Sequence, residues 1–180
     1  MTEAVLHYNR VARLLHWTIG ALIVVNLALG ILHDPLGESF PAIPIHKSIG
    51  FLVLALSLFR LVWRVVHPAP PLPASVPAWE RWSATIVHGI FYALMIVLPV
   101  TGWIFSSAGQ YPISFFFLFD IPKLAVEKGS PLAEGAHSAH EVLGYLWVVL
   151  LLIHVGAALR HHFLLKDGIA SRMWRSAPGA

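Results

Sequence analysis

The chain has 180 residues, of which 57% are hydrophobic and 12% are charged, and its mean hydropathy is +0.72. These values indicate a protein that folds in a lipid bilayer and exclude an ordinary water-soluble domain. There is no cysteine, which excludes disulfides, thiolate-bound iron–sulfur clusters and haem attached through a Cys-x-x-Cys-His motif. Eleven histidines in so apolar a chain are unusual, because an imidazole inside a bilayer needs a partner.

Four segments are long and apolar enough to cross a hydrocarbon core of about 30 Å, which takes about 20 helical residues. The predicted helices cover residues 13–32, 46–65, 82–105 and 140–164. The first is not read as a cleavable signal peptide, because Arg10 and Arg13 lead into a long apolar run with no small-residue cleavage site after it. We expect a single domain over residues 1–180, an all-α membrane protein built as a four-transmembrane-helix bundle.

The basic residues predict how this bundle is oriented. Nine of them lie on one side of the predicted helices: Arg10, Arg13, Arg60, Arg64, Arg81, Arg160, Lys166, Arg172 and Arg175. The other side carries three: Lys47, Lys123 and Lys128. By the positive-inside rule, both termini are expected in the cytoplasm.

Two of the connections are distinctive. Residues 67–77 are too rich in proline for a helix and predict a short, stiff, extended loop on the cytoplasmic side. The outer connection after Phe105 is the longest and contains the aromatic run 115–119. That run could cap a cofactor, but a position in the membrane interface is the favoured interpretation.

His140 and His154 lie 14 positions apart in an apolar run. On a helix this spacing corresponds to a rise of about 21 Å and nearly a whole number of turns. The two imidazoles therefore share one helix face at two depths, and each needs its own partner.

Counting residues along the other helices supplies those partners. His16 lies at the depth of His154 on the cytoplasmic side, and His46 lies at the depth of His140 on the outer side. Two facing neutral imidazoles are the axial ligands of a bis-histidine haem, so the pattern predicts two non-covalently bound b-type haems. Nearby glycines, which ordinary helix packing would equally explain, could admit the flat macrocycle: Gly20, Gly50 and Gly144.

His88 is an alternative partner for His154, because it lies early in the third helix at nearly the same depth as His16. His161 follows His154 by seven residues, about 10 Å further along the same face. His88 and His161 together could form a polar pocket for a quinone carbonyl and its protons. An interfacial histidine that reaches water is an equally good interpretation of His161.

Taken in order, these segments resemble the bacterial cytochrome b561 family, small di-haem cytochromes of the inner membrane that act on quinones. The resemblance covers the whole chain and rests on motifs in all four predicted helices: Leu15-His16-Trp17, Ile45-His46-Lys47-Ser48-Ile49-Gly50, Val87-His88-Gly89, Ala139-His140-Glu141, and His154 with Ala157-Ala158-Leu159-Arg160-His161-His162-Phe163. It implies that the axial ligands are His16, His46, His140 and His154. It also implies that His88 and His161 lie near a ubiquinone site.

The same resemblance suggests two functions. Similar proteins include a superoxide oxidase, which would make this chain a superoxide:ubiquinone oxidoreductase. Lys47, beside His46, could attract the anion or pair with a propionate of the outer haem. Others are cytochrome b subunits that anchor a separate dehydrogenase or accept electrons from a soluble cytochrome on the outer face. A metal transporter is disfavoured, because the histidines form two distant levels and the spans lack central carboxylates.

Overall fold

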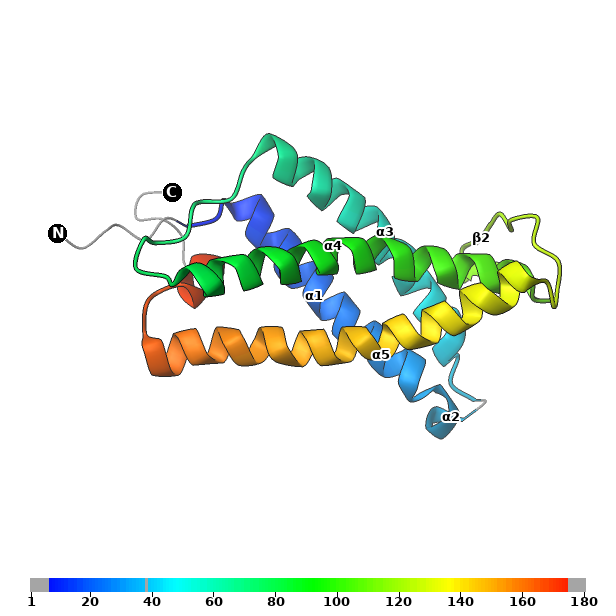
Figure 1. Cartoon of the computed structure of the whole chain (residues 1–180). Helices are drawn as coiled ribbons and strands as arrows, with labels where there is room; N and C mark the ends of the chain where they lie inside the picture. Colours follow the sequence, from blue (N-terminus) through cyan, green and yellow to red (C-terminus); the bar gives the residue numbers. More distant parts are fainter. Residues whose placement is uncertain (1–6, 38, 175–180) are drawn as a thin grey trace.

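The computed structural model describes residues 7–37 and 39–174. Four long helices dominate it: α1 Arg10–Ile31, α3 Ala42–Val66, α4 Ala78–Ser107 and α5 Pro131–Leu159. The last continues as a π-helical segment, η1 Arg160–Leu165. All four are long and apolar enough to cross a membrane, which confirms the predicted number of spans (Figure 1).

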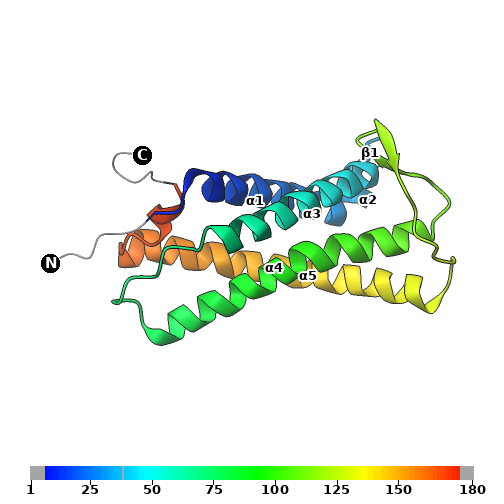
Figure 2. The same ribbon diagram turned by 90° about the horizontal axis from the view of Figure 1, so that it is seen from above.

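The helices are arranged as two pairs. Within the described part of the chain, α1 packs on α3 and α4 packs on α5, and the pairs join through α3 and α4 (Figure 2). Tyr8 N–H donates to the Arg172 carbonyl at 3.3 Å, so the two described ends of the chain lie together. We call this the terminal end of the bundle, and the opposite end the hairpin end.

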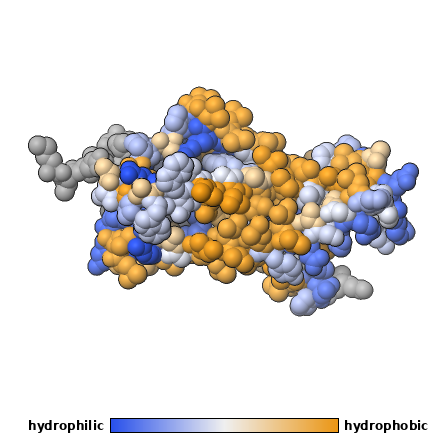
Figure 3. Space-filling view, viewed as in Figure 1, coloured by the Kyte–Doolittle hydropathy of each residue, from blue (hydrophilic) through white to orange (hydrophobic). Residues whose placement is uncertain are grey.

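The core is small, and most large apolar side chains face outward. The buried cluster comprises Leu15, Ile19, Ile49, Val53, Leu94, Met95, Leu98 and Trp147. Many other aliphatic side chains on all four helices are exposed, and they form a broad apolar surface between two more polar ends (Figure 3). A surface of this kind would aggregate in water and suits lipid, as the composition predicts.

Capping residues explain where two of the helices begin. Asn9 Oδ1 accepts from Ala12 N–H at 2.8 Å, and Ser130 Oγ accepts from Ala133 N–H at 3.3 Å. Pro131 then occupies the first turn of α5, where its missing N–H costs nothing. The helix predicted from residue 140 therefore starts nine residues earlier, and each of the other three spans also begins three or four residues before its predicted start.

The connection between α4 and α5 contains a feature that was not predicted, a small antiparallel hairpin. Strands β1 Ile113–Phe115 and β2 Phe119–Ile121 pair with Ile113 opposite Ile121. The hydroxyl of Ser48 on α3 donates to the Ser114 carbonyl at 3.1 Å and accepts from Phe116 N–H at 2.8 Å. The hairpin is thereby fastened over the start of α3, close to His46. A short helix, α2 His33–Leu36, follows α1 at the same end.

A buried arginine closes the terminal end. Arg172, on the 3-10 helix η2 Ala170–Met173, is 2% exposed and donates to the carbonyls of Pro70 and Pro71 at 2.6 and 2.9 Å. Its guanidinium also lies 5.5 Å from the Tyr8 ring centre. Burial lowers the pKa of Arg172 from its usual range. These contacts hold the proline-rich segment, which is neither helix nor strand from 67 to 77, as predicted.

Candidate functional site

The histidines predicted on the outer side face each other at the hairpin end. His46 on α3 and His140 on α5 have ring centres 5.9 Å apart, with the ring planes at 81°. His46 Nδ1 lies 2.9 Å from the Asn26 carbonyl of α1, and His140 Nδ1 lies 2.9 Å from the Leu98 carbonyl of α4. A carbonyl can only accept, so Nδ1 carries the hydrogen and Nε2 keeps a lone pair for a metal.

Each of these two rings also lies against a glycine. A Cβ placed on Gly30 would be 2.9 Å from Cε1 of His46, and one placed on Gly102 would be 2.9 Å from Cε1 of His140. Gly30 follows Asn26 by one helical turn, and Gly102 follows Leu98 by one turn. The same notch, a carbonyl and then a glycine, therefore receives a histidine from the neighbouring helix in both helix pairs.

Three histidines meet at the second level, nearer the terminal end. The ring centre of His154 on α5 lies 6.3 Å from that of His16 on α1 and 5.6 Å from that of His88 on α4. His88 Nδ1 lies 2.6 Å from the Ala84 carbonyl of its own helix. His16 Nδ1 is buried and has no hydrogen-bond partner among the described residues. Ring distances alone thus leave both predicted partners of His154 available.

His161 belongs to a separate charged cluster beyond that level. Its Nδ1 lies 2.6 Å from Asp167 Oδ2, and its Nε2 lies 3.8 Å from Glu80 Oε2. Arg160 Nη1 donates to the other oxygen of Glu80 at 2.9 Å. The wide π-helical turn and a left-handed Lys166 (φ 51°) bring Asp167 back toward His161. The sequence did not indicate that Glu80 and Asp167 would meet there.

Lys47 lies half-buried near the start of α3, directly after His46. It is within electrostatic range of Lys123, which follows β2. Lys123 Nζ also donates to the Gly109 carbonyl. Folding therefore brings two of the three basic residues of this side near each other, and one of them directly follows His46.

A family model described as prokaryotic cytochrome b561 matches residues 7–176. The chain belongs to that family. It is 34% identical over 171 residues to "Cytochrome b561 homolog 2" of Escherichia coli, covering 92% of this chain and 90% of the relative. It is 30% identical over 130 residues to "Probable superoxide oxidase CybB" of Yersinia pestis, covering 72% of each chain. A third relative, "Cytochrome b561 homolog 1" of Escherichia coli, is 27% identical over 128 residues.

Membership makes this chain a membrane electron-carrier protein of the b561 family, and the family implies haem b. The histidine geometry fits that cofactor. An imidazole nitrogen binds a transition metal at about 2 Å, and its ring centre lies about 1 Å further, so two rings on one iron have centres about 6 Å apart. The separations of 5.9 and 6.3 Å agree with this value.

The packing of this b561 chain also leaves room for a macrocycle. Among the described residues, the closely packed helix pairs are α1 with α3, α3 with α4, and α4 with α5. The pairs that carry the facing histidines, α1 with α5 and α3 with α5, are not among them. A Cβ at Gly20 or Gly144, each one turn after a candidate ligand, would meet nothing within 4 Å. Gly50, the third glycine singled out from the sequence, lies instead near the Asn26 side chain.

The structure therefore brings together four of the predicted ligands in two facing pairs, and it adds His88 to the second. Sequence reasoning missed Gly30 and Gly102. Their only signal was a glycine inside an otherwise well-formed helix, which usually has a packing or functional reason.

Proposed function

We propose that this protein is a di-haem b cytochrome that carries electrons across the inner membrane from superoxide on the outer face to ubiquinone on the cytoplasmic side. The observation that carries the proposal is the pair of histidines on α5, 14 residues apart, each facing an imidazole of another helix at about 6 Å. The excess of basic residues at the terminal end supports a cytoplasmic position for both termini.

The proposed ligands are His46 with His140 at the hairpin end and His16 with His154 at the second level. A bound haem supplies a one-electron carrier at each level. The chain's own groups orient the ligands: the carbonyls of Asn26 and Leu98 fix two of the rings.

Helix packing favours His16 over His88 as the partner of His154. His88 lies on α4, the helix that packs closely on α5, so the space between its ring and that of His154 is narrow. His16 lies on α1, which is not closely packed on α5. The larger ring separation of 6.3 Å also suits an intervening iron better than 5.6 Å.

His88 and His161 are proposed to serve the quinone. Reduction of a quinone to a hydroquinone takes two electrons and two protons, and the protons must come from the cytoplasmic side. Asp167 holds Nδ1 of His161, which leaves Nε2 to deliver a proton to a quinone oxygen. Glu80, at 3.8 Å from Nε2, would exchange protons with the same ring.

On the outer face, Lys47 and Lys123 would attract the superoxide anion. Two superoxide anions, one quinone and two protons then give two molecules of dioxygen and one hydroquinone. The name of the Yersinia relative supports this donor.

The second candidate is an electron-carrier subunit that docks a dehydrogenase or a soluble cytochrome on the outer face. The hairpin favours it, because Phe117, Leu118 and Phe119 at its tip are 64%, 78% and 56% exposed. Such a row of apolar side chains beside the outer pair could receive a partner protein.

Stopped-flow mixing of the purified protein with superoxide and a ubiquinone analogue separates the two functions. The superoxide oxidase predicts rapid haem reduction followed by hydroquinone formation, both abolished by superoxide dismutase. A docking subunit predicts no fast haem reduction by superoxide.

A further inference from the structure

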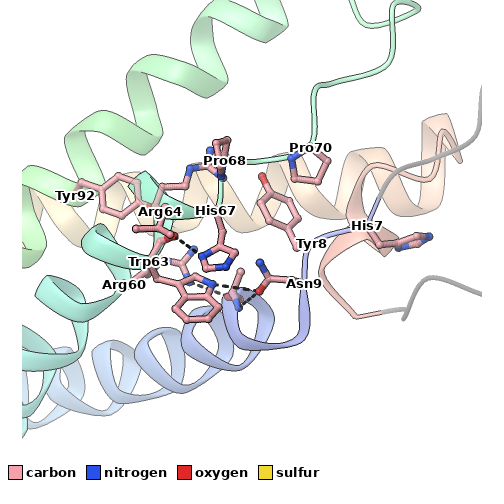
Figure 4. A pocket seen from close by; sticks show the side chains of 12 residues that line it. His7, Tyr8, Asn9, Arg60, Trp63, Arg64, His67, Pro68, Pro70 and Tyr92 are labelled. Atoms are coloured by element: carbon pink, nitrogen blue, oxygen red, sulfur yellow. Dashed lines mark hydrogen bonds between the residues drawn. The ribbon is translucent and has the colours of Figure 1, made fainter. Parts of the chain in front are cut away.

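A cavity of about 440 Å³ lies at the terminal end, between the start of α1, the end of α3 and the proline-rich segment (Figure 4). Its lining includes Tyr8 and Asn9 on one side and Arg60 and Arg64 on the other. None of the proposed haem ligands and neither residue of the proposed quinone site lines it. The cavity is therefore distinct from the ligand pairs and from the proposed quinone residues.

The end of α3 turns its basic face into this cavity. Arg60, Trp63, Arg64 and His67 follow the spacing of one helix face and all line the cavity. The opposite face carries exposed aliphatic side chains: Leu58, Leu61, Val62 and Val65. Two guanidinium groups one turn apart are thus directed toward the protein interior and away from the lipid-facing side.

Within residues 7–37 and 39–174, these charges have no acidic partner in the cavity. Of the described residues that line the cavity, none is Asp or Glu. The nearby carboxylates of the terminal end are engaged elsewhere, since Glu80 pairs with Arg160 and Asp167 with His161. Arg60 donates to the Ala12 carbonyl at 3.1 Å, and Arg64 lies 5.8 Å from the Tyr8 ring centre. A guanidinium has five N–H donors, so most of this donor capacity is open to an anion.

The cavity reaches the level of the second histidine set. Ala12, which lines it, lies one turn before His16 on α1, and Tyr92 lies one turn after His88 on α4. An anion held by the two arginines would therefore border the proposed inner haem. A b-type haem carries two propionate carboxylates on one edge, and planar guanidinium groups bind carboxylates through paired hydrogen bonds.

We propose that Arg60 and Arg64 bind the propionate carboxylates of the haem held by His16 and His154. This inference rests on the proposed function, because it requires a haem at that level. The two arginines donate hydrogen bonds to the carboxylates and balance their charge in a half-buried cavity. A free phosphate or carboxylate from the cytoplasm has the same chemistry and is the rival occupant.

The test uses holoprotein purified from cells that incorporate haem labelled with carbon-13 at the propionate carboxyls. The Arg60→Gln/Arg64→Gln variant is compared with the wild type and with Arg81→Gln, an exposed arginine of α4 outside the cavity. Redox-difference infrared spectra report the labelled carboxylate bands. A redox titration of the visible absorption bands, with chloride or phosphate as the salt, reports the two midpoint potentials.

We expect the labelled bands to shift in the double variant and to stay unchanged in Arg81→Gln. Propionates whose charge is not balanced favour the oxidised haem, so one of the two midpoint potentials should fall. We expect a fall of at least about 59 mV, which corresponds to a tenfold change in equilibrium constant for a one-electron couple. The other midpoint should remain in place, because the outer pair lies at the far end of the bundle.

An Arg60→Lys/Arg64→Lys variant separates contact from charge. It retains both charges but loses the planar fork, so its midpoint should stay near the wild-type value while its labelled bands still shift. Labelled bands identical in the wild type and the glutamine variant would overturn the inference. The inference would also be overturned if the midpoint potential of the wild type differed between phosphate and chloride while that of the glutamine variant did not. That result would assign the cavity to a free anion. A protein without haem would refute the proposed function itself.

Discussion

The two levels of candidate ligands are built differently. At the hairpin end, His46 and His140 each hydrogen-bond a carbonyl of a neighbouring helix and lie against a glycine notch. At the second level, three imidazoles share the space, and His16 Nδ1 has no partner among the described residues. The outer level is fully oriented by the protein, whereas the inner level leaves polar groups and a basic cavity that a cofactor would satisfy.

This contrast matches the roles proposed for the two levels. An entry site that only accepts single electrons works well with ligands held in fixed positions, because the histidine rings need not rearrange when an electron arrives. An exit site must also supply protons to a quinone, so it needs additional titratable groups, here His88 and the cluster around His161. The following predictions test this difference, from the largest expected effect to the smallest.

Removing one ligand at each level should remove one haem from that level only. We expect His46→Ala and His154→Ala each to reduce the haem content from two per chain to about one, measured as pyridine haemochrome. His137→Ala, an exposed neighbour on α5, is the control and should retain both. Loss of one haem in His88→Ala, with both kept in His16→Ala, would reverse the inner assignment.

Filling the glycine notch should disturb the outer level alone. In Gly102→Leu the new side chain would occupy the space of the His140 ring, so the outer haem should be lost or strongly shifted in its absorption spectrum. Gly135→Ala, at an open helical position on the same bundle, should retain both spectra and gain up to about 1 kcal/mol in stability. Normal spectra for Gly102→Leu would show that the notch does not constrain His140.

Neutralising Asp167 should affect the quinone side without affecting the entry side. In Asp167→Asn the His161 ring loses its carboxylate, and we expect hydroquinone formation to slow by about tenfold or more. Haem reduction by superoxide in the same stopped-flow traces should keep its wild-type rate. Equal slowing of both phases would mean that the cluster only stabilises the fold.

Detaching the hairpin from α3 should have the smallest effect. Ser48→Ala removes hydrogen bonds to Ser114 and Phe116, which costs about 1–2 kcal/mol and should lower the melting temperature by a few degrees. Ser83→Ala, whose hydroxyl bonds only its own helix, is the matched control. A change in haem content in Ser48→Ala would assign the hairpin a direct part in holding the outer haem.

Helix periodicity explains why so much of the ligand arrangement was predictable. Each helical residue adds a fixed rise and rotation, so residues 140 and 154 had to lie on one face at two depths. The length of the apolar segments alone predicted the four spans. The start of α5 was predicted too late, because the segment 131–139 is less apolar and its helix signal lies in Ser130 and Pro131.

Contacts that depend on how the helices cross could not be predicted. The notches at Gly30 and Gly102 arise because each histidine packs on a neighbouring helix at a glycine one turn after the carbonyl that its ring hydrogen-bonds. Asp167 reaches His161 only because η1 is a π-helix, a geometry that no residue pattern here indicated. The hairpin depends on Phe116 and Phe117 adopting positive φ values, which is uncommon for bulky residues.

The central claim, two bis-histidine haem sites at two levels of one bundle, is tested most directly by the haem-to-protein ratio of the purified wild-type protein. The account predicts two non-covalently bound b-type haems per chain. A ratio of one would contradict the existence of one of the two sites, and a ratio of zero would contradict both.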